Sequence, residues 1–527
     1  MKPAALALAL AACRPPPGGA GPGAPARPGP DTAPPADTGP APDTADTADT
    51  AAPPGPTADV WIIGAGPAGL TAAADAHAAG LRVGVLERWD APGGSSHPGS
   101  QLLFAGTSTQ AAAGIADSPA ALLAHWPALT DGGDAASPWV QRFAAEATPR
   151  VHDWLLTLGL RFRSPPTADA LDPSPRLHRL ESTGPTLPER LLALLPADTV
   201  HTGWTVTALH AEAGRVAGAW AVPTATPGAA PTLFAAPAVV LATGGFARDL
   251  PRVLAARPDL PAGPLLFGNP RNADGTGHAL AEALGAAFAN PGAIGLYAHG
   301  VPAAAGSREE RTSPQLGALP WVNAEGQRFV DETEHNSLRV GALRAAQPGD
   351  GAVWLLADAD TAPTLRFTAP GDPTAPALDA DALLAAGVGH RADTLPALAA
   401  AAGLPADALD ATLRTWNASA GGAADPFRPP GSPGAPVRTP PFTALPLGIT
   451  LSKAFGGLAV DPDGRVLGPA GAPIPGLYAA GELTGMAGGT LVGARGFNGS
   501  LSAVLLSARV AAATLAADLA AGLAAAE

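Results

Sequence analysis

Three glycines and one acidic residue near the start of the chain have the types and spacing needed to hold a dinucleotide. The stretch DVWIIGAGPAGLTAAADAHAAGLRVGVLER contains Gly64, Gly66 and Gly69 in a G-x-G-x-x-G arrangement, followed by Glu87. The first glycine permits a tight turn, the second lets a pyrophosphate approach the backbone, and the third lets a helix pack on a strand. Glu87 can accept from ribose hydroxyls and would repel a 2′-phosphate. The stretch predicts a dinucleotide site but does not separate FAD from NAD, and a glycine turn without a ligand is the alternative.

The only cysteine of the 527 residues, Cys13, ends a short apolar run. A single cysteine cannot form an intramolecular disulfide or a thiolate metal site, and the sequence predicts no metal site. Nothing around Cys13 supports a catalytic thiol. A positive start, an apolar run too short to span a bilayer and small residues before the cysteine resemble the lipobox of a bacterial lipoprotein signal peptide. This resemblance implies that residues 1–12 are removed and Cys13 is acylated; a chance run of Leu and Ala is the alternative.

Composition excludes several other classes of protein. Residues 13–57 are almost entirely Pro, Gly, Ala, Asp and Thr, so they lack the apolar surface needed to fold and predict a disordered tether. The net charge of −14 argues against nucleic-acid binding, which needs a basic surface. No Cys-x-x-Cys-His motif is present, so no c-type haem is expected on the chain. Arg509 and Asp518 interrupt the last apolar stretch, which therefore predicts a packed helix rather than a membrane span.

Hydrophobic periodicity predicts the elements that must position these residues. We expect a buried strand over Val60–Ile63, an Ala-rich helix after the glycine turn, and a second strand over Val83–Leu86. The stretches TVTALHAEAGRVAGAWAV and TLFAAPAVVLATGGF alternate apolar residues at period two, which predicts a β-meander returning to a buried strand. NADGTGHALAEALGAAF predicts a turn and a helix, PIPGLYAAGELTG another buried strand, and GARGFNGSLSAVLLSARVAA the start of a long final helix.

In this order, the pieces resemble the flavoprotein family of succinate dehydrogenase and fumarate reductase, in its flavocytochrome c and 3-ketosteroid dehydrogenase branch. The motifs that carry the resemblance are IIGAGPAGL, PGGSS, GTSTQAAAGI, VVLATGGF, ADGTGHALAEALGAA, WVNAEGQRFVDET and GLYAAGELTG. The resemblance implies an α/β fold in which a Rossmann-like FAD-binding domain with a β-meander is interrupted by an α+β capping domain. We expect the FAD-binding domain over residues 58–290 and 441–527. The cap, which excludes water from the flavin, is expected over residues 291–440.

The resemblance also implies where FAD lies. The adenosine and pyrophosphate should contact Gly64, Gly66, Gly69 and Glu87, and the adenine should contact the backbone of Val206. Gly94 and Ser95 should lie along the ribityl chain and the flavin, and Glu482 should contact the ribityl chain. The cofactor should also be lined by Thr243, Gly244, Gly245 and Asp274. Ser500 and Leu501 begin the final helix, whose positive end can stabilise the N1 and O2 anion of reduced flavin.

Some members of this family attach FAD covalently through a histidine near PGGSS. His97 lies one residue past the aligned position, so we expect non-covalent FAD. The alternative interpretation of His97 is a loop histidine that faces solvent and has no role at the flavin.

On the substrate side, the resemblance matches His299 to a substrate-binding histidine and Arg495 to an arginine whose guanidinium fork grips a carboxylate. A hydrogen-bonded cap histidine and a surface ion pair are the respective alternatives. Ser452 and Lys453 stand where a clamp histidine is expected, and Lys453 is the third candidate catalytic residue.

The proton-shuttling arginine of fumarate-reducing relatives is replaced at the aligned position by Asn336. Arg339, three residues downstream, substitutes for it only if the cap backbone differs. The substitution argues against fumarate as the substrate.

Together, these features predict a lipid-anchored, extracytoplasmic FAD-dependent oxidoreductase that transfers hydride between flavin N5 and a C–C bond next to a carbonyl. An enoate or enone reductase and a ketosteroid-type dehydrogenase both stay open. Electrons are expected to pass to or from a separate quinone, cytochrome or dioxygen. Arg14, rather than Asp, follows Cys13, which favours the outer membrane. The alternative is a flavin-binding surface lipoprotein without turnover.

Overall fold

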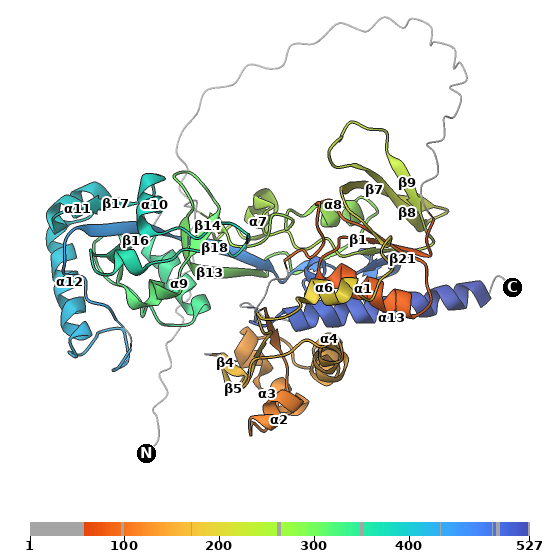
Figure 1. The fold of residues 1–527 in the computed structure, drawn as a ribbon, viewed down its shortest axis with the longest axis horizontal. Coiled ribbons are helices and arrows are strands. Elements are labelled where there is room, and N and C mark those ends of the chain that lie inside the picture. The colour runs from red at the N-terminus through yellow and green to blue at the C-terminus, as the bar shows by residue number, and fades with distance from the viewer. Residues whose placement is uncertain are drawn as a thin grey trace, which may run out of the picture. The chain divides into compact units, whose positions relative to one another are not determined.

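The computed structural model describes most of the chain after residue 56 (Figure 1). The described ranges are 57–95, 100–169, 171–260, 265–347, 352–372, 374–432, 434–486, 488–491 and 496–524. The predicted signal peptide, Cys13 and the predicted tether up to residue 56 lie outside the described residues.

A six-stranded sheet carries the glycine-rich turn. Its order is β20-β21-β10-β1-β2-β6, and all neighbours are parallel except β20 and β21. In chain order, its strands are β1 (Val60–Ile63), β2 (Val83–Leu86), β6 (Val200–His201), β10 (Val239–Leu241), β20 (Arg465–Leu467) and β21 (Pro473–Ala479). The two strands predicted on either side of the first helix are confirmed, and the register places Val60 beside Val83.

Residues of β1 alternate between two buried layers. Val60 and Ile62 belong to the core that includes helices α1 (Pro67–Ala78) and α13 (Leu501–Ala524), which pack against each other. Trp61 and Ile63 belong to a second core, shared with the meander. Successive side chains of a strand point to opposite faces, so a sheet covered on both faces needs strands that are apolar throughout. The predicted α/β class is confirmed.

The predicted β-meander is also confirmed. It consists of β7 (Trp204–Glu212), β8 (Arg215–Pro223) and β9 (Thr232–Ala235), paired antiparallel in that order. The chain then returns through β10 to the centre of the parallel sheet. This return places the end of β10 beside the end of β1, where the glycine turn begins.

A second, larger sheet forms the cap of the fold around one long strand, β18 (Phe442–Ala454). Its main order is β14-β13-β18-β16-β15, and β11 and β17 also pair with β18. The other strands are β11 (Leu265–Phe267), β13 (Ile294–Pro302), β14 (Glu310–Thr312), β15 (Trp321–Val322), β16 (Val353–Ala357) and β17 (His390–Ala392). Its helices are α9 (Asn336–Ala346), α10 (Ala380–Ala385), α11 (Leu395–Ala402) and α12 (Ala406–Ala420). A separate hydrophobic core fills this part. The sheet includes β11 and β18, which lie outside the range 291–440 expected for the cap, and these boundaries stay a prediction.

A small third sheet, with order β3-β5-β4, lies among the helices that follow the first βαβ unit. Its strands are β3 (Gln101–Leu103), β4 (Thr167–Asp169) and β5 (Asp172–Arg179). The helices around it are α2 (Ser108–Ala112), α3 (Pro119–Thr130), α4 (Pro138–Ala147), α5 (Asp153–Thr157) and α6 (Leu187–Leu192). Arg176 of β5 is buried. Its Nε and Nη2 donate to the two oxygens of Asp117, and its Nη1 donates to Asp172, so ion pairs as well as packing hold this strand.

The final helix is a packed element, as predicted. Residues 501–522 are long and apolar enough to cross a membrane, but half of the most apolar stretch is buried in the fold. Its two interrupting charges have partners: Arg509 pairs with Asp75 at 3.0 Å, and Asp518 with Arg465 at 2.8 Å. Pairing with protein groups accounts for both charges in a core helix.

Candidate functional site

The glycine turn packs as its sequence predicts. Gly64 has a φ of +105°, a conformation that favours glycine, and a Cβ on Gly69 would lie 1.8 Å from the carbonyl oxygen of Gly64. A Cβ on Gly66 would instead meet only the Cα of Gly94, at 3.9 Å, within the described part. Gly66 is the N-cap of α1 and has no side chain that could bond to the N–H groups of the first helical turn. Space for a bound group therefore lies beside these amides.

Glu87 is held at the end of β2 by two backbone donors. The N–H of Ala65 donates to its Oε2 at 2.8 Å, and the N–H of Trp89 donates to its Oε1 at 2.9 Å. The carboxylate is largely buried. Each oxygen keeps a further lone pair, so Glu87 can still accept hydroxyl donors from a ligand.

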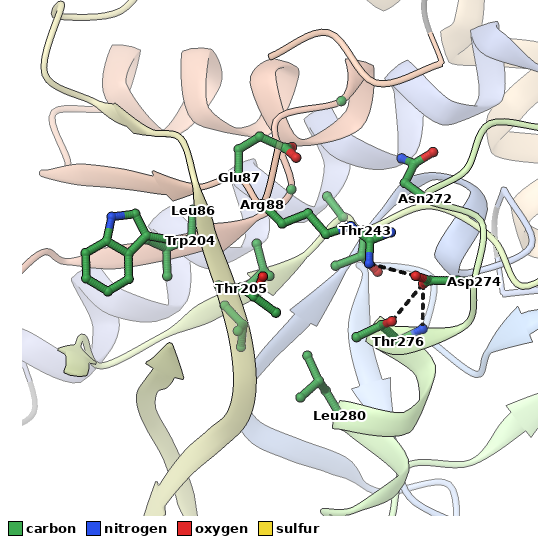
Figure 2. A pocket seen from close by; sticks show the side chains of 15 residues that line it. Leu86, Glu87, Arg88, Trp204, Thr205, Thr243, Asn272, Asp274, Thr276 and Leu280 are labelled. Carbon is green, nitrogen blue, oxygen red and sulfur yellow. Dashed lines mark hydrogen bonds and ion pairs between the residues drawn. The ribbon is translucent and has the colours of Figure 1, made fainter. Parts of the chain in front are cut away.

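These residues line a first pocket between β2, the meander and the turn before α8 (Thr276–Glu282) (Figure 2). Six predicted site residues meet there: Gly64, Gly66, Glu87, Val206, Thr243 and Asp274. The structure adds residues that the sequence reasoning did not identify: Arg88, Trp204, Thr205, Asn272, Thr276 and Leu280. Arg88 donates to Asp274 at 2.7 Å, which joins residues 186 positions apart.

A second pocket adjoins the first and shares Gly66, Ala242 and Asn272 with it. It brings together seven predicted residues: Gly66, Ser95, Gly244, Lys453, Glu482, Ser500 and Leu501. The polar residues it adds are Ser100, Gln101, Arg179, Asn269 and Ser452. Arg179 and Gln101 are register partners on β5 and β3, and their place at the pocket follows from the pairing of those strands. The two adjoining pockets together extend from the glycine turn to Ser452 and Lys453, near the end of the cap strand β18.

Glu482 lies in the short turn Gly481–Leu483 that follows β21, and it is partly buried where it lines the second pocket. Burial raises the pKa of Glu482, against the opposing effects of a hydrogen bond from the Ala454 N–H and the positive charge of Lys453. A Cβ on Gly245 would lie 2.3 Å from Oε1 of Glu482. The predicted Gly245 therefore does not line either pocket in the described part; it leaves room for Glu482.

The N-terminus of α13 closes one side of the second pocket. Ser500 forms a bridge with Leu102, and the N–H of Leu103 donates to the carbonyl of Gly499 at 3.0 Å. Gly499 has a φ of +79°, and a Cβ there would lie 2.6 Å from the Leu103 nitrogen. The close approach fixes the start of the helix, whose positive dipole end faces the pocket that Ser500 and Leu501 line.

Several predicted residues are placed only in part. Arg495 and His97 lie outside the described residues, as does Cys13. His299 belongs to β13, but the structure does not describe its side chain. Gly69 and Gly94 allow close backbone approaches next to the pockets. A Cβ on Gly94 would lie 2.8 Å from the Cα of Gly66.

Asn336 is the first residue of α9, and Arg339 is occupied within the cap. The Arg339 guanidinium donates to the Glu332 carbonyl at 2.8 Å and to the Asn336 side chain, and it lies over the Trp321 ring. Burial lowers the pKa of Arg339 to about 10, opposed by Glu332, Asp331 and Glu334. Arg339 is not among the described residues that line the two pockets. Its position therefore does not favour Arg339 as a replacement for the proton-shuttling arginine.

Comparison with known proteins identifies the family. Residues 59–496 match the family described as FAD binding domain, so the chain belongs to this family and FAD is its cofactor. The chain is 28% identical over 450 residues to the NADH:fumarate oxidoreductase of Klebsiella pneumoniae, which covers 82% of this chain but only 45% of that protein. It is 27% identical over 548 residues to a KsdD-like steroid dehydrogenase of Mycobacterium tuberculosis, which covers 87% of this chain and 95% of that one.

The fold is shared with a solved flavocytochrome c3 fumarate reductase in its open conformation. The TM-score is 0.69 at 23% identity, over 88% of this chain and 79% of that one. The predicted resemblance to the flavoproteins of the fumarate reductase and 3-ketosteroid dehydrogenase type is confirmed, together with the capped α/β fold.

The described residues fit FAD. The open space beside Gly66 and the two pockets that adjoin there suit a long dinucleotide. Two buried polar groups at the pockets have no hydrogen-bond partner in the described part of the chain: the Thr243 hydroxyl and the Asn269 side-chain amide. Buried polar groups are normally paired, so a bound group that supplies partners explains them.

Proposed function

We propose that the chain is an FAD-dependent oxidoreductase that acts on a C–C bond next to a carbonyl. When bound, the flavin supplies the chemistry by accepting or donating hydride at N5. The observation that carries the proposal is the second pocket. It extends from the predicted cofactor residues Glu482 and Ser500 to Ser452 and Lys453 at the end of the cap strand β18. Relatives named for fumarate and for steroid oxidation support the same bond type.

The residue roles are part of the proposal. Gly64, Gly66, Glu87, Val206, Thr243 and Asp274 hold the adenosine half of FAD, while Ser95, Gly244, Glu482, Ser500 and Leu501 hold the flavin half. Gly69, Gly94 and Gly245 make the close approaches that shape these walls. Arg495, His299 and Lys453 place positive charge or hydrogen-bond donors at the substrate carbonyl or carboxylate, which polarises the bond that receives hydride. Non-covalent attachment of FAD is also proposed, because His97 is out of register with the attachment site.

Enoates and enones are the proposed substrate classes, in either reaction direction, with fumarate disfavoured. Asn336 at the position of the proton donor is a very weak acid, and loss of a positioned donor typically lowers rates about 10²–10⁴-fold. Electrons pass to or from an external quinone, cytochrome or dioxygen in this proposal. A lipid anchor on Cys13 and residues 13–57 as a tether place the enzyme outside the cytoplasm, with the outer membrane favoured by Arg14.

The test is anaerobic. Protein reduced by light is mixed with a panel of enoates and enones, including fumarate and 3-ketosteroids, and flavin absorbance is followed. We expect rapid reoxidation by one class and slow reoxidation by fumarate. Arg495→Ala is the control that keeps FAD but loses the reaction. Protein that stays reduced with every compound would support the alternative, a flavin-binding surface lipoprotein, and fast reoxidation by fumarate would overturn the assignment at Asn336.

Acid precipitation tests the attachment of FAD in the same preparation. All yellow colour should pass to the supernatant, and colour retained in the pellet would show a covalent link.

A further inference from the structure

The first pocket is crossed by an ion pair whose role the family resemblance did not predict. Arg88 follows Glu87 at the end of β2, and Asp274 lies in the turn before α8. Nη1 of Arg88 donates to Oδ2 of Asp274 at 2.7 Å, and both residues line the pocket. Figure 2 shows the Arg88 side chain reaching from the Glu87 side of the pocket to the side formed by Asn272 and Asp274. The pair therefore joins two walls that are distant in sequence.

Asp274 is oriented for this contact. Its other oxygen, Oδ1, accepts from the Thr276 N–H at 3.1 Å and from the Thr276 hydroxyl at 2.7 Å. The two oxygens thus have separate tasks: Oδ1 fixes the turn that begins α8, and Oδ2 faces Arg88. Burial raises the pKa of Asp274, but the hydrogen bonds from Arg88 and Thr276 outweigh it and hold the pKa below its usual value. The carboxylate is therefore charged at neutral pH.

Arg88 has a nearer carboxylate in sequence but does not use it. Both oxygens of Glu87 accept backbone N–H groups, from Ala65 and Trp89, which turns that carboxylate toward the glycine turn. The Arg88 guanidinium instead lies 5.2 Å from the centre of the Trp89 ring and bonds to Asp274. The Arg88 side chain is 25% exposed and the Asp274 side chain 37%, so the pair is partly shielded and less screened than a pair on the open surface.

We propose that Arg88 and Asp274 form a clasp over the adenosine half of FAD, and that this clasp slows release of the cofactor. While the pair is closed, the walls formed by the end of β2 and by the turn before α8 cannot separate. FAD leaves only after the pair has opened. Arg88 is thus a positioning residue for the cofactor site. The inference depends on FAD binding and not on the substrate, so its outcome is independent of the enoate and enone panel.

The experiment measures FAD release from the oxidised holoprotein, by the rise in fluorescence of free FAD after dilution. Arg88→Met keeps the apolar stem and removes the charge. Asp274→Asn removes the charge but keeps an oxygen for Thr276. We expect each variant to release FAD about ten times faster than the wild type, as for one charge-assisted contact at a partly shielded site. The double variant should be no faster than Asp274→Asn alone, because Arg88→Met breaks a contact that Asp274→Asn has already removed.

The matched control is Arg82→Met, which breaks an ion pair between Arg82 and Asp59 of 2.6 Å on the open surface of the same βαβ unit. It should leave the release rate unchanged. Raising salt from 0.05 to 1 M should speed release from the wild type and from this control, and should have little effect on the double variant.

Wild-type release rates in both single variants would overturn the clasp. So would additive effects in the double variant, or tighter FAD binding by Arg88→Met, which would mean that the pair competes with the cofactor. If a variant does not fold, the wild type still decides: release that is insensitive to salt contradicts the proposal.

Discussion

The backbone N–H of Ala454 donates a hydrogen bond to Oε1 of Glu482 at 2.8 Å. This contact joins the end of the cap strand β18 to the turn that follows strand β21 of the parallel sheet. The second pocket is thus lined both by the end of the cap strand and by the turn after β21, and the partly buried Glu482 lies where they meet. Lys453, next to Ala454, supplies positive charge at the same junction.

Lys453→Met should raise the pKa of Glu482 further. The ammonium favours the charged carboxylate, so its removal leaves burial less opposed. Infrared spectra of the protein across a pH series measure this through the carbonyl band of a protonated carboxyl group, which should persist to higher pH in the variant. Adding Glu482→Gln should remove the band and identifies it. An unchanged or lower titration midpoint would contradict the prediction.

The free energy of unfolding should decrease as the pH is lowered through the range in which His178 titrates. Its Nε2 lies 2.8 Å from the Thr107 hydroxyl and its Nδ1 lies 2.8 Å from the Arg176 carbonyl. Burial, the largest cause, lowers the pKa of His178 from 6.5 to about 4. The unfolded chain thus binds more protons between these values, so the contribution is fully present above pH 6.5 and lost as pH falls toward 4. The loss is about 3 kcal/mol.

Urea unfolding from pH 4 to 8 measures this slope. His178→Gln should flatten the profile, whatever its effect on stability at pH 8. His77→Gln, on the exposed end of α1, is the control and should follow the wild type. If the free energy of unfolding of His178→Gln depends on pH as steeply as that of the wild type, groups other than His178 cause the pH dependence.

Arg495→Ala should abolish turnover while FAD stays bound. In the proposed site, a fixed guanidinium orients a carbonyl or carboxylate oxygen, and loss of it removes both charge and geometry. Arg495→Lys should recover little activity, because a point charge lacks the two-pronged donor set. Steady-state kinetics and the flavin absorbance of the purified variants measure the two effects separately. Unchanged kinetics in Arg495→Ala would refute the role.

Cys13→Ser should prevent acylation. The prediction follows from the position of the sole cysteine after a short apolar leader. Metabolic labelling with a tagged fatty acid should mark the wild type and not the variant, which should accumulate as unprocessed or soluble protein. Normal export of a wild-type protein without label would count against the anchor.

The sequence by itself predicted the βαβ unit, the meander and the final helix. Their signals are local: glycine spacing after a buried strand, period-two alternation, and charges at intervals in an apolar helix. These signals need no knowledge of distant contacts, and Val60–Ile63 and Val83–Leu86 were located to the residue. Four of the six predicted residues of the first pocket lie in the family motifs, Glu87 ends the βαβ unit, and Val206 followed from the resemblance.

Tertiary structure alone decided which distant groups meet. The sequence shows a charge after Glu87, but not that Arg88 reaches Asp274 rather than its neighbour, because the choice depends on the amides that occupy Glu87. In the same way, Arg179 reaches the second pocket only because β5 pairs with β3, and Glu482 bonds to Ala454 only because β18 ends beside the turn after β21. Strand pairing and buried hydrogen bonds between remote segments are properties of the folded chain, and no local pattern specifies them.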